Sequence, residues 1–263
     1  MLRFLRRRRG NPAGPPEWRA YVVGDVHGRL DLLEDLLAKI HAELQHHPAL
    51  HTLLVFVGDL IDRGPCSAHV IERLRTYHRE GIEPVFILGN HEEVLLRILE
   101  GDAQLIGDWR CFGGSECLQS YGLDPDELAF LADEDALARV RNAIPKNHVE
   151  FLESFVSSRR FGDYLFVHAG IRPGIPLDQQ SEFDLRWIRE PFLRDNTDHG
   201  FVVVHGHTIS RNVEERTNRI GIDTGAYRTG VLTALAIEGQ SRWLLATQQS
   251  EAEPARRGDP RAE

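Results

Sequence analysis

Eight short apolar runs, rich in β-branched and aromatic residues, set the framework of this 263-residue chain. Each run has the length of a β-strand and ends at a glycine or a turn. Between the first three runs, apolar residues recur at helical spacing over residues 30–40 and 70–77. This β-α-β-α-β order predicts parallel strands with right-handed crossovers, and hence an α/β fold. The runs are Ala20–Val23, Leu53–Val57, Val85–Leu88, Tyr164–Val167, Phe201–Val204, Ile220–Ile222, Val231–Ile237 and Trp243–Ala246.

The rest of the chain divides around these strands. Residues 93–160 have a mostly helical pattern, so we expect a helical insertion between the third and fourth strands. Short polar turns separate the last three strands, which should form an antiparallel meander that completes a second sheet. The folded domain is expected over 18–247, between a disordered basic, Pro/Gly-rich arm at 1–17 and a disordered tail at 248–263. Within the arm, the prolines of Asn11–Pro16 predict a linker.

Charge and cysteine content exclude several classes of protein. The net charge of −9 argues against general affinity for nucleic acid. Five arginines within residues 1–9 predict a solvated tail, with contact to an anionic surface or a targeting role as alternatives. Three scattered cysteines give no disulfide framework and indicate a reducing compartment. No apolar run approaches the ~20 residues of a membrane span. We therefore expect a cytoplasmic protein, of undetermined oligomeric state.

Five short motifs that contain glycine follow the ends of expected strands. Loops that leave the carboxyl ends of parallel strands gather at one edge of a sheet, where ligands bind. Residues far apart in the sequence can therefore form one site. The motifs are GDVHG (Gly24–Gly28), GDLIDRG (Gly58–Gly64), GNHE (Gly89–Glu92), HAG (His168–Gly170) and HGHT (His205–Thr208).

The residue types in these motifs indicate a metal site. Asp25 and His27 lie two residues apart, so in an extended segment their side chains leave on one side. Mixed carboxylate, amide and imidazole ligands suit divalent ions such as Mn²⁺, Fe²⁺ or Zn²⁺. A single Asp-x-His or a single surface histidine would be unremarkable. Five such motifs, each placed after an expected strand, indicate one shared centre.

These motifs resemble those of the PPP-type, calcineurin-like metallophosphoesterases, which include bacterial and phage serine/threonine protein phosphatases and symmetrical dinucleoside tetraphosphatases. The resemblance covers about residues 18–247, and GDVHG, GDLIDRG and GNHE are its most specific parts. It implies a four-layer α/β/β/α sandwich with two metal ions, most simply Mn²⁺, at the sheet edge. The insertion at 93–160 would then form a helical cap over the site and shape the choice of substrate.

The resemblance also implies roles for individual residues. His91 would be the general acid, Asp62 the carboxylate that orients it, and Arg63 an arginine that binds phosphate. In the segment RWIRE, Arg189 is the expected second arginine, with Arg186 less favoured. The first metal ion would bind Asp25 and His27, Asp59 would bridge both ions, and the second would bind Asn90, His168 and His207.

These roles describe a chemically consistent reaction. Two metal ions about 4 Å apart can share a water and lower its pKa, so that a bridging hydroxide attacks phosphorus in line with the leaving oxygen. The metal ions and Arg63 would stabilise the charge that develops on the equatorial oxygens. His91 would protonate the leaving oxygen, so no covalent phosphoenzyme is required.

Three further residues of the motifs have weaker assignments. His205 is expected to be structural, because the second histidine of HGH is the ligand in this pattern. Glu92 is expected to support its loop rather than to bind metal. Asp223 ends a strand, and its sequence context leaves open whether it lies beside the metal ligands.

Departures from the family pattern point to its bacterial branch. Leu88 stands before GNHE, where eukaryotic protein phosphatases usually have arginine, and Ile222–Gly230 (IDTGAYRTG) replaces their SAPNY-like loop. Within the insertion, Arg110–Gly122 (RCFGGSECLQSYG) is similar to a stretch of bacterial members.

The preferred function is therefore a serine/threonine protein phosphatase that acts on phosphomonoesters, with a phosphorylated protein or a small phosphoester as substrate. The alternative is a symmetrical dinucleoside tetraphosphatase (Ap4A hydrolase). An inactive phosphate-binding module is disfavoured, because all six expected ligands, His91 and Asp62 are present.

Overall fold

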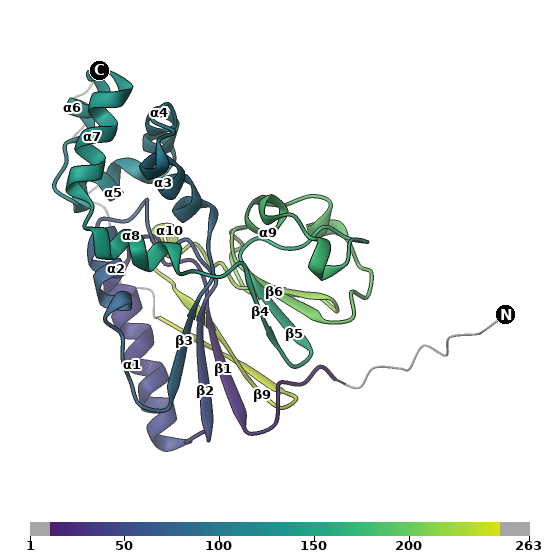
Figure 1. Ribbon diagram of the computed structural model, residues 1–263. Coiled ribbons are helices and arrows are strands. Elements are labelled where there is room, and N and C mark those ends of the chain that lie inside the picture. Colours follow the sequence, from purple (N-terminus) through teal and green to yellow (C-terminus); the bar gives the residue numbers. More distant parts are fainter. Residues whose placement is uncertain (1–10, 248–263) are drawn as a thin grey trace, which may run out of the picture.

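Two five-stranded sheets lie face to face in the computed structural model, which describes residues 11–247 (Figure 1). The first sheet has the order β10-β9-β1-β2-β3, with β1, β2 and β3 parallel. Helices α1 (Leu30–His46) and α2 (Ser67–Arg75) connect these three strands, which confirms the expected β-α-β-α-β order. The strands of this sheet are β1 (Trp18–Val23), β2 (His51–Phe56), β3 (Ile82–Phe86), β9 (Thr233–Glu238) and β10 (Ser241–Ala246).

The second sheet has the order β4-β5-β6-β8-β7. Its central strands β5, β6 and β8 are parallel, and the two edge strands are antiparallel to their neighbours. The short helix α9 (Glu182–Trp187) lies outside this sheet and supplies part of the fourth layer (Figure 1). The strands are β4 (Ser158–Phe161), β5 (Tyr164–Val167), β6 (Val202–His205), β7 (Glu214–Glu215) and β8 (Arg219–Gly221).

The expected C-terminal meander is wrong. Only β8 joins the second sheet, where it runs parallel to β6, whereas β9 and β10 form a hairpin that extends the first sheet beside β1. The residues between β8 and β9, which include the short helix α10 (Ala226–Thr229), cross from one sheet to the other. The composition of β9 explains this placement, because both of its faces are apolar and a strand beside β1 is covered on both sides.

Alternation of side chains along the strands produces the layers. In β1, Tyr21 and Val23 pack against the helices, while Ala20 and Val22 face the second sheet. Since successive side chains of a strand point to opposite faces, one strand contributes to two cores. A third core outside the second sheet contains Leu165 of β5, with residues of α9 and the loop after it. The expected α/β/β/α sandwich is confirmed in these layers.

The insertion between β3 and β4 is helical, as expected. Most of its helices stand above the end of the first sheet at which β1, β2 and β3 finish (Figure 1). Their inner faces continue the core between α1, α2 and the first sheet. The elements are α3 (Asn90–Glu100), α4 (Leu105–Trp109), the π-helical turn η1 (Arg110–Gly114), α5 (Ser115–Ser120), α6 (Pro125–Ala129), α7 (Asp133–Ala143) and α8 (Lys146–Glu153).

The linker expected at Asn11–Pro16 is instead docked onto the fold. The amide of Gly14 donates to the carbonyl of Gly239 over 2.8 Å, and Ala13 exchanges hydrogen bonds with Asp163. The prolines do prevent a helix or a central strand, but the remaining backbone groups find partners in two turns. The arginines at 1–9 and the tail at 248–263 lie outside the described residues. Within residues 11–247, no helix has the length and apolar character needed to cross a bilayer.

Candidate active site

The five motifs converge at the edge where the parallel strands of both sheets end. Asp25 and His27 follow β1, Asp59 follows β2, and Asn90 follows β3 at the first residue of α3. The other two histidines come from the second sheet, after β5 and β6. All six expected metal ligands are buried, between 0% and 8% exposed: Asp25, His27, Asp59, Asn90, His168 and His207.

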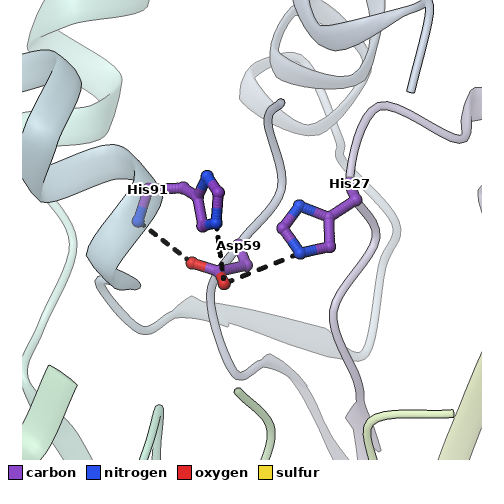
Figure 2. Close-up of side chains that lie close together, drawn as sticks. All are labelled: His27, Asp59 and His91. Carbon is purple, nitrogen blue, oxygen red and sulfur yellow. Dashed lines mark hydrogen bonds and ion pairs between the residues drawn. The ribbon is translucent and has the colours of Figure 1, made fainter. Parts of the chain in front are cut away.

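Asp59 lies at the centre of this arrangement (Figure 2). Its Oδ2 is 3.7 Å from Nε2 of His27, and its Oδ1 is 3.4 Å from Nε2 of His168. Two groups of potential ligand atoms, each within 4.8 Å of one another, share this carboxylate. One group joins it to His27 and His91, and the other to His168 and His207. A shared carboxylate between two groups is the geometry that a bridging ligand requires.

Backbone carbonyls fix the orientation of two of the histidines. Nδ1 of His27 donates to the carbonyl of Ile61 over 2.8 Å, and Nδ1 of His168 donates to that of Val57 over 2.8 Å. Each ring therefore turns Nε2, with its lone pair, toward Asp59. Burial lowers the pKa of His27 to about 3 and also lowers that of His168, so both rings are neutral and able to ligate.

Asn90 and His168 face each other through two acceptor atoms without a proton between them. Oδ1 of Asn90 is 2.9 Å from Nε2 of His168, whose single ring proton is already on Nδ1. The same oxygen is 2.8 Å from Nδ1 of His207, while Nε2 of His207 is buried without a hydrogen-bond partner in the described part of the chain. A cation bound between such acceptors would satisfy them.

Asp25 carries a further sign of a missing positive charge. Its Oδ2 accepts a hydrogen bond from the amide of His207 over 3.0 Å, but its Oδ1 is buried with no partner among residues 11–247. Burial raises the pKa of Asp25 well above its usual range, and the nearby carboxylates of Asp223 and Asp59 raise it further. Divalent cations would relieve this repulsion, so the residues present fit a metal centre.

His91 has the environment expected of a general acid. Its Nδ1 donates to Oδ2 of Asp62 over 2.6 Å, and the side chain of Asp62 is fully buried. Burial disfavours the imidazolium, but the charges of Asp59 and Asp62 outweigh it and raise the pKa of His91 to about 9. Nε2 of His91 points toward Asp59 and lies 3.9 Å from its Oδ2 (Figure 2).

Arg63 is held beside His91 by a residue that the sequence did not identify. Its Nη1 donates to the hydroxyl of Tyr227 over 3.0 Å, and its guanidinium lies 4.8 Å from the centre of that ring. Its Nη2 is 3.2 Å from Nε2 of His91 and can donate there only when Nε2 carries no proton. Tyr227 belongs to the Ile222–Gly230 segment that departs from the eukaryotic pattern, and this departure was the available signal.

The two arginines of RWIRE have different environments. Arg189 lines a cavity of about 320 Å³ together with Arg63, His91 and other site residues. Arg186 is instead engaged by Glu93, at 3.2 Å, and by Glu182. The structure thus brings Arg189 to the site and leaves Arg186 in an ion-pair network.

The cavity combines the polar site with an aromatic wall. Its polar part is formed by Asn90, His91, His207, Arg63, Arg189, Arg97 and Asp108. Phe112 of the insertion and Trp187 of α9 supply aromatic rings on its other sides, and Trp109, which is 2% exposed, borders the cavity. A wider cavity of about 760 Å³ opens near residues 215–218 and is lined by none of the expected site residues.

Glu92 supports its loop, as expected. Its carboxylate accepts hydrogen bonds from four backbone amides, those of Asp59, Leu60, Ile61 and Gly89, at 2.7–3.2 Å. Three of these amides belong to the loop that carries Asp59, and the fourth directly precedes Asn90. This single side chain therefore ties together two ligand-bearing loops. The interaction explains why a glutamate follows GNH.

His205 and Asp223 occupy different positions relative to the centre. Nδ1 of His205 contacts the carbonyl of Gly206 at 3.0 Å, its ring packs against Phe192, and it belongs to neither group of potential ligands. Asp223 accepts a hydrogen bond from Gly225 over 2.8 Å, and burial raises its pKa to about 6. The negative charge of Asp223 helps to raise the pKa of Asp25.

Backbone strain is concentrated at the site. Of the six non-glycine residues with positive φ in the described chain, five are expected site residues, with φ between 46° and 71°. Such conformations persist where the surroundings enforce them, and they cluster at functional sites. The five are His27, Asp59, Asp62, Arg63 and His207.

Two packed mixed sheets, with loops that bring carboxylate, amide and imidazole groups to one edge, define a metal-dependent phosphoesterase. The chain belongs to the calcineurin-like phosphoesterase family, which it matches over residues 19–229. Members of this family use a dinuclear centre of divalent metal ions. A solved structure provisionally assigned as a diadenosine tetraphosphatase shares the fold, with a TM-score of 0.63, 23% identity and coverage of 92% of this chain and 100% of that one.

Curated relatives carry different activities in their names. The chain is 28% identical to the asymmetrical bis(5'-nucleosyl)-tetraphosphatase PrpE of Oceanobacillus iheyensis, over 87% of this chain and 92% of the relative. It is 27% identical to the symmetrical bis(5'-nucleosyl)-tetraphosphatase of Dechloromonas aromatica, over 90% and 99%. It is 26% identical to serine/threonine-protein phosphatase 2 of Escherichia coli, over 83% and 92%.

Proposed function

We propose that this phosphoesterase hydrolyses dinucleoside polyphosphates, and that it does so with Asp25, His27, Asp59, Asn90, His168 and His207 as ligands of two metal ions, most simply Mn²⁺. The observation that carries the choice of substrate is the cavity, where Arg63 and Arg189 stand beside the aromatic rings of Phe112 and Trp187. Arginines suit phosphate oxygens, and aromatic faces stack on nucleobases. This reverses the order of preference that the sequence suggested.

The metal ions would supply Lewis acidity and a water of lowered pKa as the nucleophile. The protein's own residues bind the substrate beside them. Guanidinium groups of Arg63 and Arg189 hold phosphate oxygens and stabilise their charge in the transition state. Nη2 of Arg63 lies 3.2 Å from Nε2 of His91, so a phosphate held by Arg63 would lie beside the acid.

His91 completes the reaction from the other side. With Nε2 protonated, its ring gives that proton to the leaving oxygen, and Asp62 holds the imidazole in place through its 2.6 Å hydrogen bond to Nδ1. The buried carboxylate also stabilises the charged ring before the transfer. The arrangement needs no protein nucleophile.

A phosphorylated serine or threonine is the second candidate substrate. The similarity to the Escherichia coli phosphatase supports it, and the same metal ligands, acid and arginines would serve a phosphomonoester. The aromatic wall is what separates the two candidates, since a serine side chain offers no ring to stack on it.

A direct comparison of substrates tests the proposal. Metal-reconstituted protein is assayed with diadenosine tetraphosphate and with a phosphoserine peptide, and kcat/KM is determined for each. We expect the nucleotide to be preferred, and its products distinguish symmetrical cleavage (two ADP) from asymmetrical cleavage (ATP and AMP). A preference for the phosphopeptide would reverse the assignment. Failure to hydrolyse either substrate or p-nitrophenyl phosphate would refute the phosphoesterase proposal as a whole.

A further inference from the structure

One carboxylate oxygen at the site serves donors from two distant parts of the chain. Oδ2 of Asp62 accepts a hydrogen bond from Nδ1 of His91 over 2.6 Å and another from the indole Nε1 of Trp109 over 2.8 Å. Oδ1 of the same carboxylate is buried with no hydrogen-bond partner in the described chain. The two donors that share Oδ2 therefore orient this carboxylate, and the buried thiol of Cys117 lies close to it.

Trp109 is fixed in the cap by close packing. It ends α4, is 2% exposed, and its ring lies against the bare backbone of Gly114. A Cβ atom at position 114 would stand 2.4 Å from the ring, so only glycine permits this approach. The indole thus reaches Asp62 from a fixed direction rather than from a mobile side chain.

The same turn of the cap also contacts the next residue of the catalytic loop. The carbonyl of Gly113 accepts a hydrogen bond from the amide of Arg63 over 2.9 Å. Gly113 has φ +108°, and a Cβ atom there would lie 2.5 Å from Cγ of Arg63. Residues 109–114 are therefore fitted to Asp62 and Arg63 together, one through a side chain and the other through the backbone.

We infer that Trp109 is a positioning residue for the general acid, through which the cap holds Asp62 and so aims His91 at the leaving oxygen. The inference rests on the proposed hydrolytic function and adds a role that comes from the insertion. The indole N–H can only donate, so it stabilises the ionised carboxylate. A carboxylate oxygen has more than one lone pair, so Oδ2 can accept from His91 at the same time. Removing this donor would let the carboxylate of Asp62 rotate, so the imidazole of His91 would lose its fixed orientation.

Trp109→Phe tests the role, because it removes the N–H and keeps an aromatic ring in the packed site. An acid matters most when the leaving oxygen is basic. We expect kcat on phenyl phosphate to fall about 10-fold, the scale of a lost hydrogen bond to a charged group. Turnover of 2,4-dinitrophenyl phosphate should change little, and KM should be retained for both esters. In an Asp62→Asn background, the same substitution should cause no further loss.

Trp243→Phe is the matched control. The indole of Trp243 also donates to a carboxylate, that of Glu43 at 3.1 Å, but it lies on β10 away from the cavity. This variant should keep the wild-type dependence on the leaving group. A Trp109→Phe variant that slows both esters equally, or neither, would overturn the positioning role.

A spectroscopic measurement covers the case in which the variant is damaged more generally. The proton in the short hydrogen bond between His91 and Asp62 should give a low-field NMR signal. Trp109→Phe should shift or broaden this signal, while the amide resonances remain those of a folded protein. An unchanged signal would contradict the inference. Wild-type protein that hydrolyses neither these esters nor diadenosine tetraphosphate would instead refute the proposed function, so the two failures are distinguishable.

Discussion

Nε2 of His168 lies 2.9 Å from the side-chain oxygen of Asn90, although the proton of the imidazole is committed to the carbonyl of Val57. Two lone pairs thus face each other in a buried site. Oδ1 of Asp25, in the same centre, is also buried without a partner in the described chain. These acceptor atoms together require a positive charge between them.

Metal binding should stabilise the fold. Protein treated with chelator should unfold at a lower temperature than protein with Mn²⁺ added back, because the cation offsets repulsion among buried carboxylates. At a metal concentration 100 times Kd, the gain is about 2.7 kcal/mol, which corresponds to roughly 5–10 °C in a domain of this size. Differential scanning calorimetry measures the shift, and identical melting temperatures with and without metal would contradict it.

Asp59→Asn should lose bound metal. Its carboxylate is shared by both groups of potential ligands, so neutralising it weakens two sites at once. Elemental analysis after gel filtration should show a clear drop in metal per chain. The surface variant Asp102→Asn, which removes a carboxylate that pairs with Arg97, is the control and should retain metal. An unaltered metal content in Asp59→Asn would exclude the bridging role.

His91→Asn should impair turnover while metal content is retained. The change removes the proton donor, and we expect kcat on a substrate with a poor leaving group to fall about 10²- to 10⁴-fold. A substrate with a good leaving group should be affected much less. Steady-state kinetics on the two esters and a metal assay on the same sample decide the matter. Unchanged turnover of the poor substrate would remove His91 from the acid role.

Arg189→Ala should weaken binding of phosphate-containing substrates more than Arg186→Ala does. Arg189 lines the cavity, and loss of one charge-assisted hydrogen bond to phosphate predicts a fall in kcat/KM of about 10- to 100-fold. Arg186 is paired with Glu93, so its removal should chiefly lower the melting temperature. Kinetics and thermal unfolding of both variants provide the comparison, and the opposite pattern would show that the arginines were assigned the wrong way round.

Glu92→Ala should destabilise the protein strongly, because it leaves four buried backbone amides without their acceptor. Each unsatisfied group costs about 1–3 kcal/mol. Glu92→Gln keeps one acceptor oxygen and should lie between the alanine variant and the wild type. Urea unfolding gives the order, with the exposed Glu100→Ala on the same helix as control. Equal stability of all variants would show that Glu92 does not hold the loops.

The sequence predicted the parallel half of the fold because its signals are local. Strand-length apolar runs alternate with helical repeats up to β3, and each contact between neighbours follows from that order. The C-terminal strands could not be assigned in this way. Their apolar runs show that strands exist. The strand that pairs with β9 depends on which sheet has a free edge, and this is decided only when the layers assemble.

The same division applies to the site. The ligand-bearing motifs were accessible from the sequence, because glycine-bounded turns after strands gather at one edge of a sheet. The roles of individual residues, such as His91 as the acid, came from the resemblance to the family. Trp109 and Tyr227 were not, since a tryptophan in a helical cap and a tyrosine in a loop have no local pattern that aims them at Asp62 and Arg63. Only long-range packing brings those donors and rings to the centre. The sequence thus specified which groups could do the chemistry, and the tertiary structure decided which neighbours hold them in place.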